Sequence, residues 1–299
     1  MVSELSVLIP IYNYDVSSLV SALLAQCREL TSRFEICLYD DGSDEKIRQK
    51  HRLLNQHEEI RYVELRRNIG RAAIRNQLAR DAKYQFLLFL DNDSALPDKL
   101  FIKRYWESPA DAEVVIGGTI YEAELPAERN ILRWKYGRAR EEKSGEVRNK
   151  NPYQSLTLNN LLIRKLVCLK FPLNTDLTGY GHEDTKFGWE LQKAGIKILH
   201  IDNPVIHLGL EPAADFIKKT KQGVRNLYRL YQSQETQPDS KLIRSYELLK
   251  KFGLRFVFYK SFQLMKDTVL ENLLSPDPSL RYFDLYKLYL FTRQALKKR

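Results

Sequence analysis

Short apolar runs alternate with longer amphipathic stretches over the first 95 residues. The apolar runs, typical of buried strands, span residues 5–11, 34–39, 60–65 and 86–90. Apolar residues recur with helical spacing between them, which predicts helices over 16–30, 44–56 and 69–83. This alternation predicts an α/β fold with a mixed, mostly parallel sheet flanked by helices.

The pattern is less regular downstream. We predict strands over 114–120 and 156–163, a helix over 184–194, and a final strand pair over 196–201 and 204–208. Residues 122–150 look like a charged, irregular insertion. After residue 211 the pattern changes to amphipathic helices over 213–232, 241–274 and 280–298, so the chain is expected to end in a helical region, 212–299.

Polar residues follow each of the first four predicted strands. They are Asn13, the turn from Asp40 to Ser43, the segment from Arg67 to Gly70, and the triplet Asp91-Asn92-Asp93. Ligands of parallel sheets bind at the carboxyl ends of the strands. We therefore expect these side chains to meet at one edge of the sheet.

The Asp91-Asn92-Asp93 triplet comes directly after five apolar residues. Residues two apart in an extended chain point the same way, so Asp91 and Asp93 can face one divalent cation. Mg²⁺ is usually bound by one or two carboxylates together with substrate phosphates. The alternative is a solvated turn that caps a following helix, and the triplet alone does not exclude it.

Two further segments have both a binding and a structural interpretation. A carboxylate at Asp40 or Asp41 can accept a hydrogen bond from a base or ribose, or the turn can simply begin a helix. The helix after Gly70 carries Arg71 and Arg75, which can reach a phosphate near its N-terminus or remain ordinary surface charges.

The segment 179–184 presents Glu183 and Asp184 at the start of a predicted helix. Such a carboxylate can act as a general base toward a hydroxyl, although helix capping is again the alternative. His207 ends the last predicted strand and is a candidate third metal ligand, whereas His200 is expected to be a satisfied strand residue.

Composition narrows the class of protein. The 299 residues contain 43% hydrophobic and 29% charged side chains, as in ordinary globular proteins. No signal peptide or run of ~18 apolar residues is evident, which predicts a cytoplasmic protein. Three widely spaced cysteines fit reduced core thiols. Residues 212–299 hold 18 basic and 8 acidic residues and therefore account for the whole net charge of +10.

The motifs in this order resemble those of the family 2 glycosyltransferases with the GT-A fold, from about residue 5 to residue 207. The resemblance rests on the opening segment 10–13, the turn 40–43, the segment 68–70 followed by Arg75-Asn76, the triplet 91–93, and the pair 183–184. It implies a GT-A catalytic domain over 1–211, with a nucleotide-sugar half (about 1–95) and an acceptor half (about 96–211).

The same resemblance implies an inverting hexosyl- or N-acetylhexosaminyl-transferase that uses a nucleotide-sugar donor, most often a UDP-sugar, with Mn²⁺ or Mg²⁺. Asp93 and His207 would bind the metal with Asp91 nearby, Asp184 would be the base, and Glu183 would bind the acceptor. The donor would contact residues at the strand ends: Pro10, Tyr12, Asn13, Asp40, Asp41, Asn68, Gly70, Arg75, Asp91 and Asn92. A glycan or lipid-linked glycan is the expected acceptor, in surface polysaccharide synthesis.

Basic residues interleave with aromatic residues in 212–299. This pattern fits peripheral docking on an anionic inner membrane face, or packing of the aromatics as core, in the catalytic chain or in a homo-oligomer. A nucleic-acid partner is disfavoured because it leaves the strand-end carboxylates unexplained. A nucleotidyltransferase and a non-catalytic nucleotide-sugar binder remain alternatives. The first usually has a glycine-rich phosphate loop after its first strand, which this chain lacks.

Overall fold

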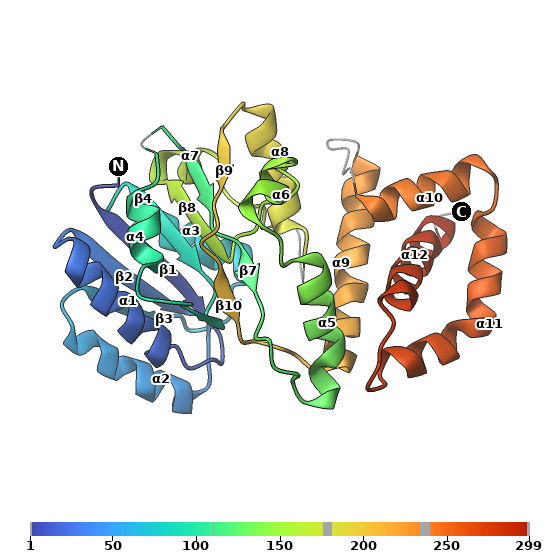
Figure 1. Ribbon diagram of the computed structural model, residues 1–299, viewed down its shortest axis with the longest axis horizontal. Helices are drawn as coiled ribbons and strands as arrows, with labels where there is room; N and C mark the ends of the chain where they lie inside the picture. The colour runs from blue at the N-terminus through green and yellow to red at the C-terminus, as the bar shows by residue number, and fades with distance from the viewer. Residues whose placement is uncertain (1, 110, 176–180, 234–239, 298–299) are drawn as a thin grey trace. The chain divides into compact units, whose positions relative to one another are not determined.

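The computed structural model describes residues 2–109, 111–175, 181–233 and 240–297 (Figure 1). The described residues form two compact units. The first contains those within 2–122, 142–175 and 183–209, and the second contains 123–141, 181–182 and the residues from Leu210 onward. The division at residues 211 and 212 stays a prediction about domain boundaries.

A seven-stranded sheet forms the centre of the first unit, in the order β3-β2-β1-β4-β8-β6-β9. Its strands are β1 (Leu5–Ile11), β2 (Phe34–Asp40), β3 (Ile60–Glu64), β4 (Phe86–Leu90), β6 (Val114–Ile116), β8 (Asn160–Arg164) and β9 (Ile198–His200). Strand β8 pairs antiparallel with both of its neighbours, and the other pairings are parallel. The predicted mixed, mostly parallel sheet is confirmed.

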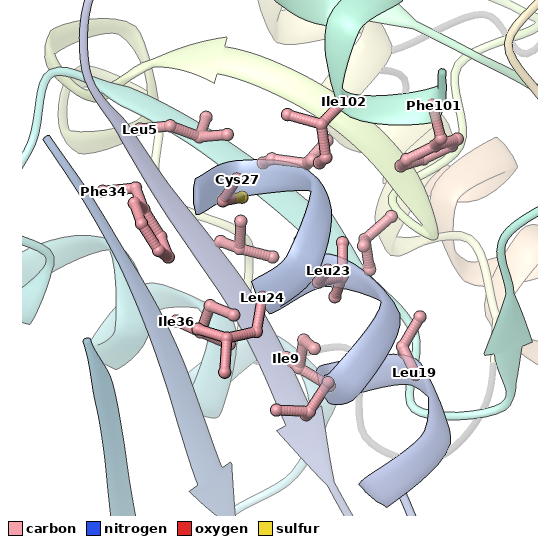
Figure 2. Close-up of a cluster of buried hydrophobic side chains, with 14 of the residues drawn as sticks. Leu5, Ile9, Leu19, Leu23, Leu24, Cys27, Phe34, Ile36, Phe101 and Ile102 are labelled. Carbon is pink, nitrogen blue, oxygen red and sulfur yellow. The ribbon is translucent and has the colours of Figure 1, made fainter. Parts of the chain in front are cut away.

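Helices cover both faces of this sheet because its strands are apolar on both sides. In β1, Val7 and Ile9 pack toward one face while Leu8 packs toward the other. The first face is covered by α1 (Ser17–Leu30) and α4 (Phe101–Trp106), and Figure 2 shows side chains of α1 lying against those of β1 and β2. The second face is covered by α3 (Arg71–Asp81), α7 (Lys165–Lys170) and α8 (Glu183–Lys193).

A small second sheet lies in the same unit, in the order β5-β10-β7. Strand β10 (Val205–His207) pairs antiparallel with β5 (Ser94–Ala95) and parallel with β7 (Thr119–Ile120). Because β5 follows the 91–93 triplet directly, this pairing places His207 opposite Ser94.

Several predicted element boundaries are wrong. The strand expected over 114–120 is broken between β6 and β7, where Gly118 has a φ of 94° that lies outside the β region. The expected strand pair 196–201 and 204–208 is also wrong, since β9 and β10 belong to different sheets. The strand expected over 156–163 begins only at Asn160, and the helix expected over 44–56 is an α-helix, α2 (Glu45–Arg52), continued by a 3₁₀ turn, η1 (Leu53–Gln56).

The expected irregular insertion at 122–150 is helical. It contains η2 (Glu128–Asn130), α5 (Ile131–Arg140) and α6 (Gly145–Asn149). The apolar residues of α5 are few but correctly spaced, so that Leu132 and Tyr136 join the core of the second unit. The surrounding charged residues conceal this spacing in the sequence.

The second unit is a helical cluster of α5 with α9 (Ala213–Ser233), α10 (Lys241–Lys251), α11 (Arg255–Leu273) and α12 (Leu280–Lys297). The helix expected over 241–274 is interrupted at Gly253, whose φ is 70°. Many of the interleaved aromatics are core residues: Phe262 stacks on Tyr289 with ring centroids 4.7 Å apart, whereas Phe252 and Phe256 are exposed. Among the described residues, no helix is both long enough and apolar enough to cross a membrane.

Candidate active site

The centre of the large sheet is a topological switch point. From β1 the chain proceeds first to β2 and β3 on one side and then to β4 on the other side. Ligands of open α/β sheets bind beyond the carboxyl ends of the strands at such a point. Asn13 follows β1 here, and Asp91, Asn92 and Asp93 follow β4.

Asp91 forms an ion pair with Arg75 of α3. The Arg75 guanidinium is 7% exposed and donates from Nη2 to the Asp91 carboxylate, which is 27% exposed, and Nη1 donates to the Arg71 carbonyl at 3.3 Å. The Nε atom of Arg75 is buried and has no hydrogen-bond partner in the part of the chain that the structure describes. Arg75 therefore neutralises Asp91, and the two carboxylates of the triplet have different surroundings.

Asp93 faces His207 across the small sheet. The Asp93 Oδ1 and His207 Nδ1 atoms lie 3.5 Å apart, and the Leu208 amide donates to the Asp93 carbonyl at 2.8 Å. Burial raises the pKa of Asp93, but His207 and Arg71 outweigh burial and hold that pKa below its usual value. Asp93 is therefore held as a carboxylate.

Glycine 209 makes room for this carboxylate. A Cβ atom at Gly209 would lie 2.0 Å from Asp93 Oδ2, so only glycine permits the observed position. The ring of Tyr121 contacts His207 edge-on, with centroids 5.5 Å apart. Packing thus holds both side chains of the Asp93–His207 pair in place.

The pair fits a divalent cation. Within the described part of the chain, Asp93 Oδ1 and His207 Nε2 are both buried without a hydrogen-bond partner, which is costly unless a ligand uses them. The described residues contain no cluster of three or more ligating side chains. A cation held here would take its remaining ligands from water or a substrate diphosphate, as Mg²⁺ commonly does.

Asp184 lies within electrostatic range of the Asp91–Arg75 pair. It is in the first turn of α8, next to Glu183, and both side chains are half-buried. Burial, with smaller contributions from the charges of Glu183 and Asp91, raises the pKa of Asp184 to about 7 against the opposing charge of Arg75. The structure therefore brings Asp184 to the same site as the 91–93 triplet. Gly179 and Tyr180 of the predicted turn lie outside the described residues.

Asp40 and Asp41 hold the loops around the site. Asp40 is fully buried; its Oδ1 accepts from the Gly42 and Ser43 amides at 3.0 and 2.6 Å, and its Oδ2 accepts from Tyr62 at 3.1 Å. The Asp41 oxygens accept from the amides of residues 69 and 70 at 2.6 and 3.1 Å. Both carboxylates therefore hold the loops in position through hydrogen bonds. The contact of Asp40 with a nucleobase stays a prediction.

The other predicted donor contacts surround this edge of the sheet. Asn13 has a φ of 49°, and its Oδ1 accepts from the Asp44 amide at 2.8 Å. The Asn92 side chain donates to the Tyr12 carbonyl at 3.4 Å, and the Tyr12 ring is 52% exposed. Pro10 is half-buried in β1, Asn68 is exposed, and Gly70 precedes α3 with a φ of 90°. Their contacts with a donor stay predictions.

Sequence reasoning missed Gly209, Tyr121 and the role of Arg71 near Asp93. Gly209 lies two residues after His207, and its requirement comes only from a side chain more than a hundred residues away. For Arg71 the sequence offered one signal, since this residue lies one helical turn before Arg75. No comparable signal marks Tyr121.

Comparison with known proteins connects this geometry to a family. The sequence model described as Glycosyl transferase family 2 matches residues 6–165, which include the strand-end motifs up to Asp93. An uncharacterized glycosyltransferase of Rickettsia felis is 31% identical over 102 residues. That alignment covers 34% of this chain and 17% of the relative.

Solved structures share the fold. The mannosyltransferase PcManGT from Pyrobaculum calidifontis, in complex with GDP-Man and Mn²⁺, has a TM-score of 0.60 at 14% identity, covering 98% of this chain and 86% of that one. S. aureus TarS 1–349 in complex with UDP-GlcNAc has a TM-score of 0.51 at 15% identity, covering 99% and 92%. The chain belongs to glycosyl transferase family 2 and has the GT-A fold.

Proposed function

We propose that this protein transfers a hexosyl or N-acetylhexosaminyl group from a nucleotide diphosphate donor, with UDP as the first nucleotide to test, to a hydroxyl group of a glycan or lipid-linked glycan. The observation that supports this most strongly is the Asp93–His207 pair, whose buried Oδ1 and Nε2 atoms have no hydrogen-bond partner among the described residues. Asp184 lies in range of the adjacent Asp91 carboxylate. A pair that can hold a cation beside a weakly acidic carboxyl would supply leaving-group stabilisation and a general base, which inverting transfer to a hydroxyl can use.

In this proposal Asp93 and His207 hold Mn²⁺ or Mg²⁺, with Asp91 beside them. The bound cation would supply positive charge against the diphosphate leaving group. Arg75 keeps Asp91 neutralised and fixed, so the carboxyl end of β4 does not carry two uncompensated negative charges. The neighbouring structures that hold GDP-Man with Mn²⁺ or UDP-GlcNAc support this class of donor.

Asp184 is the proposed general base. Its carboxylate takes the proton from the acceptor hydroxyl while that oxygen forms a bond to the anomeric carbon of the sugar. The bond from that carbon to the diphosphate oxygen breaks on the opposite face, which inverts the configuration. A pKa of about 7 suits this role because a base works best when its pKa is close to the operating pH. Glu183 is proposed to bind the acceptor.

The test is a screen of donor hydrolysis with UDP-, GDP- and dTDP-sugars in the presence of Mn²⁺, Mg²⁺ or a chelator. We expect cation-dependent release of the nucleotide diphosphate, reduced about a hundredfold or more in Asp93→Asn. The matched control is Asp98→Asn, because Asp98 is an exposed carboxylate that pairs with Arg104 away from the site. Turnover that survives the chelator at the full rate would remove Asp93 and His207 from the proposed role.

A second measurement separates binding from chemistry. Asp184→Asn should bind the donor with the wild-type affinity and transfer sugar about 10²–10⁴-fold more slowly, which is the usual contribution of a general base. Normal transfer by this variant would refute the base assignment while leaving the cation site intact.

A further inference from the structure

The second unit contains an open hollow with a basic lining. Its volume is about 570 Å³, and the start of α11 and the end of α12 form its walls. The side chains that determine its character are Arg255, Phe256, Tyr259, Lys260, Arg293 and Lys297. Four of these six are cationic, and no acidic residue lines the hollow.

Among the described residues, no carboxylate neutralises the positive charge of this hollow. Residues 248–266 include five cationic side chains and no acidic side chain, and residues 285–299 contain no acidic side chain either. Glu247 and Asp284 pair with Lys250 and Lys287 instead. Within the described part of the chain, none of Arg255, Lys260, Arg293 and Lys297 forms an ion pair with a carboxylate, so the lining favours an anion.

Exposed apolar side chains accompany these cations. Phe256 and Val257 are 59% and 58% exposed, Phe252 is 66% exposed, and Leu264 is 92% exposed. Other aromatics of the same helices are buried, so the core of the unit does not need these side chains. Exposed apolar residues gathered within one short stretch are characteristic of an interaction surface.

We propose that the docking surface formed by this hollow and the exposed side chains of Phe252, Phe256, Val257 and Leu264 binds the face of a bilayer that contains anionic phospholipids. Lipid phosphates would occupy the basic hollow, and the exposed apolar side chains would enter the interfacial region of the bilayer. The combination of cationic and exposed apolar side chains favours a bilayer over a nucleic acid, because the phosphate backbone of a nucleic acid has no apolar surface for Val257 and Leu264 to contact. A second copy of the chain is disfavoured because it would bring two sets of four cations together.

The test is flotation of the full-length protein with vesicles, without donor or acceptor, so that it does not depend on the proposed transferase activity. Vesicles of phosphatidylcholine mixed with phosphatidylglycerol are compared with vesicles of phosphatidylcholine alone, at low and high salt. The hollow variant combines Arg255→Gln, Lys260→Gln, Arg293→Gln and Lys297→Gln. The matched control removes the same number of cations from α9 with Lys218→Gln, Lys221→Gln, Arg225→Gln and Arg229→Gln.

We expect the wild-type protein to float with the anionic vesicles at low salt and to detach at high salt. The hollow variant should bind the anionic vesicles roughly a hundredfold more weakly, because each cation near an anionic surface contributes several-fold to binding. The affinity of the α9 control should be closer to that of the wild-type protein. Phe256→Ser with Leu264→Ser should also weaken binding. All variants should retain wild-type thermal unfolding and donor turnover.

Three results would overturn the proposal. One is a wild-type protein that does not bind anionic vesicles at low salt. The second is equal weakening in the hollow variant and the α9 control, which would mean that only net charge matters. The third is a dimer in light scattering, without vesicles, that the hollow and serine variants convert to monomer, since this would assign the surface to a second copy.

Discussion

Replacing Gly209 by alanine tests the candidate cation site through a residue that has no ligating or titratable side chain. The added Cβ would lie 2.0 Å from Asp93 Oδ2 and 2.7 Å from its Cγ, whereas ordinary contacts begin at 3.4 Å. The Asp93 carboxylate must therefore move by about 1.4 Å. A displacement of ~1 Å in a positioned catalytic group can cost about a hundredfold in rate, or about 2.7 kcal/mol of transition-state stabilisation.

The fold itself should tolerate this change. Gly209 does not have a φ in the left-handed region, so alanine adds no backbone strain. Alanine also restricts the unfolded chain, which contributes about 0.4–1 kcal/mol in favour of folding. We therefore expect the free energy of unfolding to change by less than the transition-state stabilisation that is lost, which is about 2.7 kcal/mol.

The assay is a Mn²⁺ titration of donor hydrolysis, with metal binding measured separately by calorimetry. Gly209→Ala should require a higher Mn²⁺ concentration for half-maximal rate and should turn over about a hundredfold more slowly at wild-type concentrations. Gly195→Ala is the control, because a Cβ there meets nothing within 4 Å. Its φ of 69° strains alanine by about 1–2 kcal/mol, so this variant should lose stability and keep the wild-type Mn²⁺ response. In an Asp93→Ala background, Gly209→Ala should cost little more. A wild-type Mn²⁺ response in Gly209→Ala would refute the reasoning.

The remaining predictions concern the base, the loops and the bound cation. The value of kcat/KM should rise with pH as Asp184 loses its proton. Glu183→Gln should move this rise to lower pH and Arg75→Gln should move it to higher pH, because the two charges act on the pKa of Asp184 in opposite directions. A rise that neither variant moves would contradict the assignment of Asp184 as the base. Asp41→Ala leaves two loop amides without their acceptor and should lower the free energy of unfolding by about 2–3 kcal/mol in urea titrations, with Asp41→Asn intermediate. Mn²⁺ at about 100 times its Kd should stabilise the protein by ~2.7 kcal/mol. A thermal scan would show this as a rise of about 5–10 °C in Tm. An equal rise in Asp93→Asn would mean that the cation binds elsewhere.

The site shows why Asp91 and Asp93 differ although they are chemically identical. Asp91 is neutralised by a guanidinium on α3, whereas Asp93 faces His207, which leaves one buried oxygen and one buried nitrogen for a ligand. The sequence places both carboxylates at the end of one apolar strand and does not distinguish their partners. The partners come from elements far away along the chain.

The C-terminal helices illustrate a second limit. Aromatic and basic residues interleave throughout this region, and both core packing and surface exposure are compatible with that pattern. The structure buries Tyr246, Phe262 and Tyr289 and exposes Phe252 and Phe256. The two exposed residues flank the break at Gly253, which separates α10 from α11 and which the sequence pattern did not reveal.

The sequence by itself determined the elements of the first 95 residues and the polar residues at their ends, because strand and helix periodicity are local properties and parallel strands end at a common edge. Tertiary structure alone decided the strand order, the helical nature of 122–150, the small sheet that brings His207 to Asp93, and the need for glycine at position 209. Each of these depends on contacts between residues distant in the chain, and such contacts leave no periodic signal in the sequence.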